Sequence, residues 1–118
     1  MGHLGILLFA SPVQHRMADT AAVLAEAAGR LGHTVTIFFL GDAVYCTSRA
    51  LAAADAEGAV HRFAGLPPSV ALVNCSTCAR FRGLDDDALI GNARNGTLED
   101  LVELLGDSDR FLALTGES

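Results

Sequence analysis

The chain has 118 residues and a mass of 12.3 kDa, the size of one domain that can form a hydrophobic core without disulfides or a structural metal. Its net charge is −6, and all of its basic residues are arginines. The absence of lysine excludes P-loop and Schiff-base chemistry, and without a basic stripe nucleic acid is not an expected partner. Apolar residues make up 51% of the chain and charged residues only 19%, which favours contacts between subunits.

The first expected element is a strand over residues 4–9, a continuous apolar run of the kind that is buried on both faces of a sheet. No basic segment precedes this run, so it is interpreted as a strand and not as a signal peptide. No stretch of the sequence has the length needed to cross a bilayer. We therefore expect a cytoplasmic protein with no membrane partner, whose three cysteines are free or catalytic in a reducing compartment.

The following elements alternate between helix and strand. Apolar residues recur at helical spacing over 16–31, and Gly32 follows as a residue that ends helices. Residues 34–40 are rich in β-branched and aromatic side chains, which is typical of a strand. Asp42 is placed to cap a helix that continues to Ala54.

The second half of the chain is expected to contain short helices and two strands. The strands are apolar runs, and the longest of the helices begins with a capping box formed by Thr97 and Asp100. In chain order, the expected elements are a short helix and loop over 55–69, a strand over 70–73, short helices over 75–81 and 85–91, a helix over 97–105 and a strand over 111–114.

Strands that alternate with helices predict a single α/β domain with a flavodoxin-like parallel sheet and helices on both faces. The expected strand order is 2-1-3-4, with the first strand between the second and third, and it leaves room for a fifth strand. Ligands of such sheets bind beyond the carboxyl ends of the strands. Segments 10–14, 41–46 and 74–78 should meet at that edge, which brings all three cysteines to it.

The pattern of the cysteines predicts sulfur chemistry. Cys75 follows a buried strand and begins a short helix, where unpaired N–H groups and the helix dipole favour the nucleophilic thiolate. Cys78 lies three residues further on, where the dipole is weaker, so Cys75 is expected to react first. Cys78 can resolve an oxidised Cys75 or pack on the sheet. Asp42 and Cys46 are expected to line a pocket at the same edge, although burial of free cysteines also makes Cys46 a candidate core residue.

Several stretches resemble the DsrE/DsrF-like family, particularly its YchN-like branch. They are CSTCARFRGL at 75–84, LIGNARNGT at 89–97 and FLGDAVYC at 39–46. The resemblance implies a small α/β protein that assembles as a homotrimer or homohexamer and carries sulfur as a cysteine persulfide between donor and acceptor proteins. It assigns the relay position to Cys75, and it matches Cys78 and Cys46 to additional cysteines of the YchN-like branch.

The main alternative function is a dithiol redox or protein-interaction module that uses Cys75 and Cys78 without sulfur loading. A thioredoxin-like oxidoreductase shares the Cys-x-x-Cys motif, but its motif follows an early strand and faces a proline loop, and here no proline follows Pro68. A zinc site needs further ligands, and the four histidines lack ligand spacing. No glycine-rich fingerprint favours FMN or a nucleotide. We therefore expect a sulfur carrier or sulfurtransferase component without a cofactor or metal.

Three charged or titratable residues near the cysteines have two interpretations each. Arg80 and Arg82 are expected to form a solvated helix face, and the alternative is that one of them stabilises a thiolate or an incoming sulfur anion. His15 is interpreted as a surface residue, but it belongs to the expected active edge and could tune a thiolate there.

Overall fold

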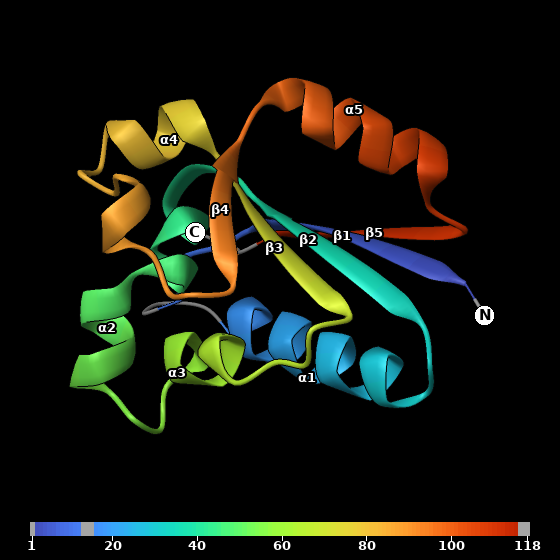
Figure 1. Cartoon of the computed structure of the whole chain (residues 1–118), viewed down its shortest axis with the longest axis horizontal. Helices are drawn as coiled ribbons and strands as arrows, with labels where there is room; N and C mark the ends of the chain where they lie inside the picture. Colours follow the sequence, from blue (N-terminus) through green and yellow to red (C-terminus); the bar gives the residue numbers. More distant parts are fainter. Residues whose placement is uncertain (1, 13–15, 116–118) are drawn as a thin grey trace.

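Strands alternate with helices along the chain, as the hydrophobic pattern predicts. The computed structural model describes residues 2–12 and 16–115 (Figure 1). In chain order, its elements are β1 (His3–Phe9), α1 (Met17–Arg30), β2 (Thr34–Phe39), η1 (Gly41–Thr47), α2 (Arg49–Ala54), α3 (Ala59–Ala64), β3 (Val70–Cys75), α4 (Ser76–Arg80), η2 (Asp86–Ala88), β4 (Ala93–Gly96), α5 (Leu98–Asp107) and β5 (Arg110–Thr115), where η marks a 3-10 helix.

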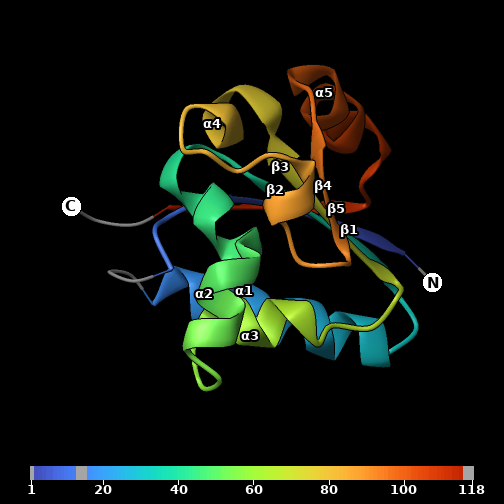
Figure 2. The ribbon, with the colours of Figure 1, turned by 60° about the vertical axis from the view of Figure 1, so that its left-hand side comes forward.

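The strands of the described part of the chain form one five-stranded parallel sheet in the order β4-β3-β2-β1-β5. Helices α1 and α3 cover one face, with α2 beside them, and α4 and α5 lie on the other face (Figures 1 and 2). In the central strand β2, the neighbours Ile37 and Phe38 point to opposite faces of the sheet and both are buried, as expected for a strand that is covered on both faces. The predicted α/β class, a flavodoxin-like parallel sheet between two layers of helices, is confirmed.

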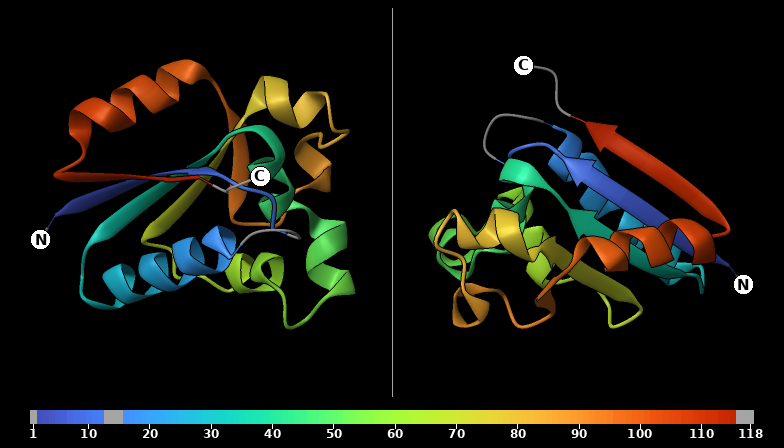
Figure 3. Two further views of the ribbon diagram at one scale, coloured as in Figure 1. Left: turned by 180° about the vertical axis from the view of Figure 1, so that it is seen from behind. Right: turned by 90° about the horizontal axis from the view of Figure 1, so that it is seen from above.

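The strand order differs from the expected 2-1-3-4. β2 lies between β1 and β3, and the last strand, β5, pairs with β1 (Figure 3). The connection from β1 to β2 runs through α1, and the connection from β2 to β3 runs through α3. Because both helices pack on the same face and such crossovers are right-handed, each connection adds the next strand in the same direction. The chain then returns through α5 on the opposite face and adds β5 at the free side of β1. β4 is the additional, fifth strand that the sequence analysis allowed beside the four predicted strands.

The expected helix from Asp42 to Ala54 is interrupted. Its first part is η1, and α2 begins only after Ser48, whose backbone is extended (φ −71°, ψ 122°) and whose Oγ accepts the N–H of Leu51 at 3.2 Å. The cap residue is therefore Ser48 and not Asp42. The capping box of α5 is confirmed, since the Thr97 N–H donates to the Asp100 carboxylate at 2.7 Å.

The core has a larger part on the α1 side of the sheet and a smaller part on the α5 side. On the α1 side, Phe63 of α3 packs edge-on against Phe39 of β2, with 5.3 Å between the ring centroids. Both rings are completely buried. The smaller part on the α5 side is built from buried residues of β2, β3 and α5, namely Phe38, Val73, Cys75 and Leu104. The thiol of Cys75 therefore belongs to this second cluster.

Truncation of Phe63 should reveal how strongly α3 depends on this packing. Phe63→Ala is expected to lower the free energy of unfolding by about 3 to 5 kcal/mol, because it removes a buried ring and leaves a cavity. Phe81→Ala is the matched control, since that ring is 85% exposed and should contribute less than about 0.5 kcal/mol. Urea denaturation followed by circular dichroism measures both values, and equal losses would contradict the assignment of Phe63 to the core.

Candidate functional site

Cys75 is the last residue of β3 and the N-cap residue of α4, as the sequence predicts. Its backbone is still extended (φ −65°, ψ 115°), and the chain turns into the helix at the next residue. Because side chains alternate along a strand, Cys75 points to the same face as Val73, toward the α5 side of the sheet. Only 5% of the residue is exposed. The thiol therefore lies at the edge of the core and not on the open surface.

Cys78 lies one turn further along α4, and its half-buried side chain packs against both parts of the core. Its sulfur accepts a hydrogen bond from the Gly41 N–H, and its thiol is hydrogen-bonded to Cys75. The pKa of Cys78 is raised, mainly by burial and further by the hydrogen bond and negative charge of Cys75, whereas the Gly41 N–H and the Arg82 charge lower it. Burial and the neighbouring Cys75 thiol therefore favour the protonated form of Cys78.

Arg82 connects the chain after α4 to the beginning of η1. Its Nε donates to Asp42 Oδ1 at 2.8 Å, and its Nη1 donates to the carbonyl oxygen of Cys78 at 2.9 Å. Arg80, by contrast, is exposed. The two arginines that the sequence treats as one solvated face are thus distinct, because the Arg82 side chain is hydrogen-bonded to the backbone of Cys78 and Arg80 is exposed.

Cys46 is completely buried in the core on the α1 side, within η1. Burial raises the pKa of its thiol strongly, and the negative charge of Asp19 raises it further. The structure thus agrees with the interpretation of Cys46 as a core residue and does not place it on a pocket wall. Asp42, the other residue expected to line a pocket, is an exposed partner of Arg82.

A buried polar network that the sequence analysis did not identify lies next to Cys75. Asn74 is completely buried, and its Nδ2 donates to Thr47 Oγ1 at 2.8 Å and to Asn95 Oδ1 at 3.2 Å. Its Oδ1 has no hydrogen-bond partner among the described residues. Thr47 Oγ1 in turn donates to the carbonyl oxygen of Val44 at 2.8 Å. The sequence signal for this network is an asparagine inside an apolar strand.

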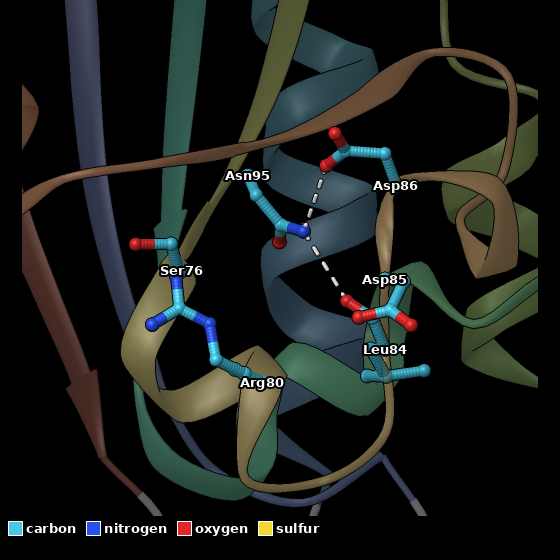
Figure 4. Close-up of a pocket in the computed structure, with 6 residues that line it drawn as sticks. All are labelled: Ser76, Arg80, Leu84, Asp85, Asp86 and Asn95. Atoms are coloured by element: carbon cyan, nitrogen blue, oxygen red, sulfur yellow. Dashed lines mark hydrogen bonds between the residues drawn. The ribbon is translucent and has the colours of Figure 1, made fainter.

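A hollow of about 350 Å³ opens beside the beginning of α4 (Figure 4). Within it, Asn95 Nδ2 donates to the carbonyl oxygen of Leu84 at 3.2 Å and to Asp86 Oδ1 at 3.0 Å. These bonds fix the loop after α4 against β4, close to the segment that carries the thiols. The hollow is lined by Ser76, Arg80, Leu84, Asp85, Asp86 and Asn95.

The histidines in the described part of the chain do not gather around the cysteines. His3, at the beginning of β1, is hydrogen-bonded to Thr34 Oγ1 at 2.6 Å, and His33 Nδ1 accepts the Gly2 N–H at 3.0 Å. His15 lies outside the described residues. Across residues 2–12 and 16–115, no group of three or more His, Cys, Asp or Glu side chains could hold a metal ion. Nor does any helix within those ranges have the length and apolar character required to span a bilayer.

Removal of the Cys75 thiol should change the ionisation of Cys78. Cys75→Ala removes a hydrogen bond and a negative charge that both raise the pKa of Cys78, so the pH midpoint for alkylation of Cys78 should move to lower pH. Peptide mass spectrometry after timed iodoacetamide treatment measures this midpoint. Cys46 serves as the internal reference and should stay unlabelled until the protein is unfolded, because it is completely buried. A midpoint that stays constant or moves to higher pH would contradict the thiol contact.

Comparison with protein families identifies one match that spans almost the whole chain. The model of the DsrE/DsrF-like family matches residues 3–114. This range includes β3, both cysteines of the motif and the three residues of the buried network. No curated protein sequence matches the chain.

The fold is shared with several solved structures. The crystal structure of the ychN protein from E. coli has a TM-score of 0.86 and 22% sequence identity, and the match covers 97% of this chain and 100% of that one. A protein of unknown function from Methanobacterium thermoautotrophicum has a TM-score of 0.69 at 13% identity, with 96% and 99% of the chains covered. A conserved protein of unknown function from Bacteroides thetaiotaomicron has a TM-score of 0.70 at 18% identity, with coverages of 96% and 95%. At these identities, the likeness shows the fold alone.

Proposed function

We propose that this chain, which belongs to the DsrE/DsrF-like family, is a sulfur carrier or sulfurtransferase component of an intracellular relay and holds sulfane sulfur as a persulfide on Cys75. The observation that carries the proposal is the contact between the thiols of Cys75 and Cys78 at the carboxyl edge of the sheet. The relay position that the sequence resemblance assigns is the last residue of β3. The persulfide itself is the transferable group, so the proposal needs no cofactor.

In the loading step, the Cys75 thiolate attacks the outer sulfur of a persulfide on a donor protein. A new bond forms between Cys75 and that sulfur, while the sulfur–sulfur bond of the donor breaks and its electron pair stays on the donor thiolate. No external oxidant or reductant is needed, because the sulfane sulfur keeps its oxidation state. The raised pKa of Cys78 disfavours its thiolate, which leaves the attack to Cys75.

The persulfide on Cys75 can be discharged by two routes, and atoms and electrons balance in both. The thiolate of an acceptor protein can attack the outer sulfur of the persulfide, which returns Cys75 to a thiolate. Alternatively, the Cys78 thiolate can attack the inner sulfur, which forms a Cys75–Cys78 disulfide and releases hydrosulfide. The hydrogen bond between the two residues supports the second route, because it places the attacking thiol beside its target.

The burial of Cys75 suits a relay between proteins. A thiol that is only 5% exposed is shielded from bulk oxidants, and a docked donor or acceptor is needed to reach it. Free thiols persist in a reducing compartment, so we place the protein in the cytoplasm. The second candidate function, a dithiol redox or interaction module, draws on the same contact between Cys75 and Cys78 but involves no transferred sulfur atom.

Sulfur loading distinguishes the two functions. Reduced protein is incubated with a cysteine desulfurase and cysteine, or with rhodanese and thiosulfate, and then analysed by intact-mass spectrometry before and after dithiothreitol. The carrier should gain one sulfur atom that dithiothreitol removes. Cys75→Ser should abolish the gain, whereas Cys78→Ser should preserve or prolong it, because the internal discharge route is lost.

Two results would contradict the proposal. If the unmodified protein never gains sulfur but forms the Cys75–Cys78 disulfide under mild oxidation, the dithiol module is the better description. If Cys78→Ser abolishes loading while Cys75→Ser leaves it intact, the roles of the two cysteines are reversed.

We further propose that the chain assembles as a homotrimer or homohexamer through α5. Leu98, Val102 and Leu105 of this helix are between 53% and 67% exposed, and their spacing of four and three residues places them on one face. An exposed apolar stripe of this kind is typical of a subunit interface. β5, which follows α5, is an edge strand of the described sheet.

Light scattering should report a mass several times 12.3 kDa at micromolar protein concentration. Val102→Glu should reduce that mass, because it places a charge in the apolar stripe. Val23→Glu on α1 is the matched control, since Val23 is also about half exposed but lies on the other side of the sheet. A monomeric protein would contradict the proposal. If Val23→Glu dissociates the assembly and Val102→Glu does not, the interface is formed by α1 and not by α5.

A further inference from the structure

We propose that Arg82 is a positioning residue for the Cys78 thiol. It ties the chain that carries Cys78 to the beginning of η1, so that the Cys78 sulfur stays in contact with the Gly41 N–H. The inference deepens the proposed function and rests on it in one respect, namely that Cys78 attacks the Cys75 persulfide.

The first observation is that one guanidinium group joins two segments. Arg82 donates through Nε to Asp42 Oδ1 at 2.8 Å and through Nη1 to the carbonyl oxygen of Cys78 at 2.9 Å. The guanidinium is planar, so its donors hold these two acceptors in a fixed relative position. The side chain of Arg82 is 27% exposed and that of Asp42 62%, and ion pairs at such exposure add little to stability. The pair therefore matters for geometry more than for the stability of the fold.

The second observation is that the anchor lies beside the group that contacts the sulfur. Asp42 directly follows Gly41, whose N–H donates to the Cys78 sulfur. Gly41 has a φ of +62°, and a Cβ at this position would overlap the ring of Phe9. The sulfur and the backbone carbonyl of one cysteine are thus both held by the first two residues of η1, the sulfur directly and the carbonyl through Arg82.

This arrangement favours the form of Cys78 that discharge requires. The Gly41 N–H and the positive charge of Arg82 both stabilise the thiolate, against the effects of burial and of the neighbouring Cys75. The titratable and charged groups that act on this sulfur are Cys75 on its own segment and Arg82 after α4, and Asp42 on η1 is paired with Arg82. If Arg82 is removed, one stabilising charge is lost and the Gly41 contact loosens.

The test measures Cys78 ionisation in a Cys75→Ala background, where the result does not depend on sulfur loading. In this background, Arg82→Gln should move the pH midpoint for alkylation of Cys78 upward, so that alkylation below the midpoint becomes about three- to tenfold slower. Arg80→Gln is the matched control, because Arg80 is exposed and is not among the groups that shift the pKa of Cys78, so its midpoint should equal that of the background. Arg82→Lys keeps the charge but loses the planar pair of donors, so it should restore only part of the rate.

The variant Asp42→Ala distinguishes a positioning role of Arg82 from an effect of its positive charge alone. If Arg82 acted only through its charge, removal of a neighbouring negative charge would make Cys78 easier to ionise. A positioning role predicts the opposite, slower alkylation, because Arg82 loses its anchor on η1. The proposal is overturned if Arg82→Gln leaves the midpoint unchanged or if Asp42→Ala lowers it.

Loading separates this inference from the proposed function. With Cys75 present, Arg82→Gln should accept sulfur as the unmodified protein does and should retain the persulfide about threefold longer or more, in line with the slower thiolate chemistry of Cys78. If the unmodified protein accepts no sulfur, the proposed function fails, while the titration result still decides the role of Arg82. If loading occurs but Arg82→Gln loses sulfur as quickly as the unmodified protein, Arg82 has no part in discharge and the inference is overturned.

Discussion

The pairing of β2 with β3 is the constraint on which the thiol site depends. Phe39 pairs with Asn74 in register, so the two strands end side by side and the chain turns into η1 and α4 at the same edge. Neighbouring strands lie about 4.8 Å apart, which lets the Gly41 N–H reach the Cys78 sulfur. In the order 2-1-3-4, β1 would lie between them and the separation would be about 10 Å. Neither this contact nor the one between Asp42 and Arg82 could then form.

The strand that carries Cys75 is held on both of its faces by different kinds of interaction. On the α5 side, Val73 and Cys75 belong to an apolar cluster. On the other side, the amide of Asn74 links η1 to β4 through Thr47 and Asn95. A buried amide is costly unless it is hydrogen-bonded, so these bonds favour one arrangement of the three segments over its alternatives. The edge that carries the thiols is therefore fixed by polar contacts that the apolar core alone does not supply.

The sequence predicts the elements whose signals are local. The strand over 4–9, the helix over 16–31 and the capping box at Thr97 follow from patterns within a few residues, and the structure contains all three. The strand Ala93–Gly96 was not predicted as such, because it contains no β-branched or aromatic residue and owes its conformation to pairing with β3. The strand order was wrong because it depends on which face each helix covers, and tertiary packing decides that.

The difference between features set by local sequence and features set by tertiary packing also applies to the thiol site. The place of Cys75 at the junction of a strand and a helix was predictable, because an apolar run ends there. The difference between Arg80 and Arg82 was not, since both are arginines near the end of one short helix. Successive helical residues are about 100° apart around the axis, so two such residues point in nearly opposite directions, and only one can face η1. Which one does so depends on where η1 lies, and this again follows from the strand order.

The position of the thiols in the sheet bears on the kind of chemistry that the fold supports. The direction in which strands are added reverses between β1 and β5, and ligands of open α/β sheets usually bind in the crevice at such a point. Cys75 and Cys78 lie instead beyond the ends of β2 and β3, two neighbours that were added in the same direction. A single sulfur atom needs no crevice. It needs a nucleophile, a second thiol within reach and backbone groups that hold both, and two adjacent strand ends supply these because each continues into a turn at the same edge. The proposed transfer of a sulfur atom therefore uses the ends of two adjacent strands and not the crevice between β1 and β5.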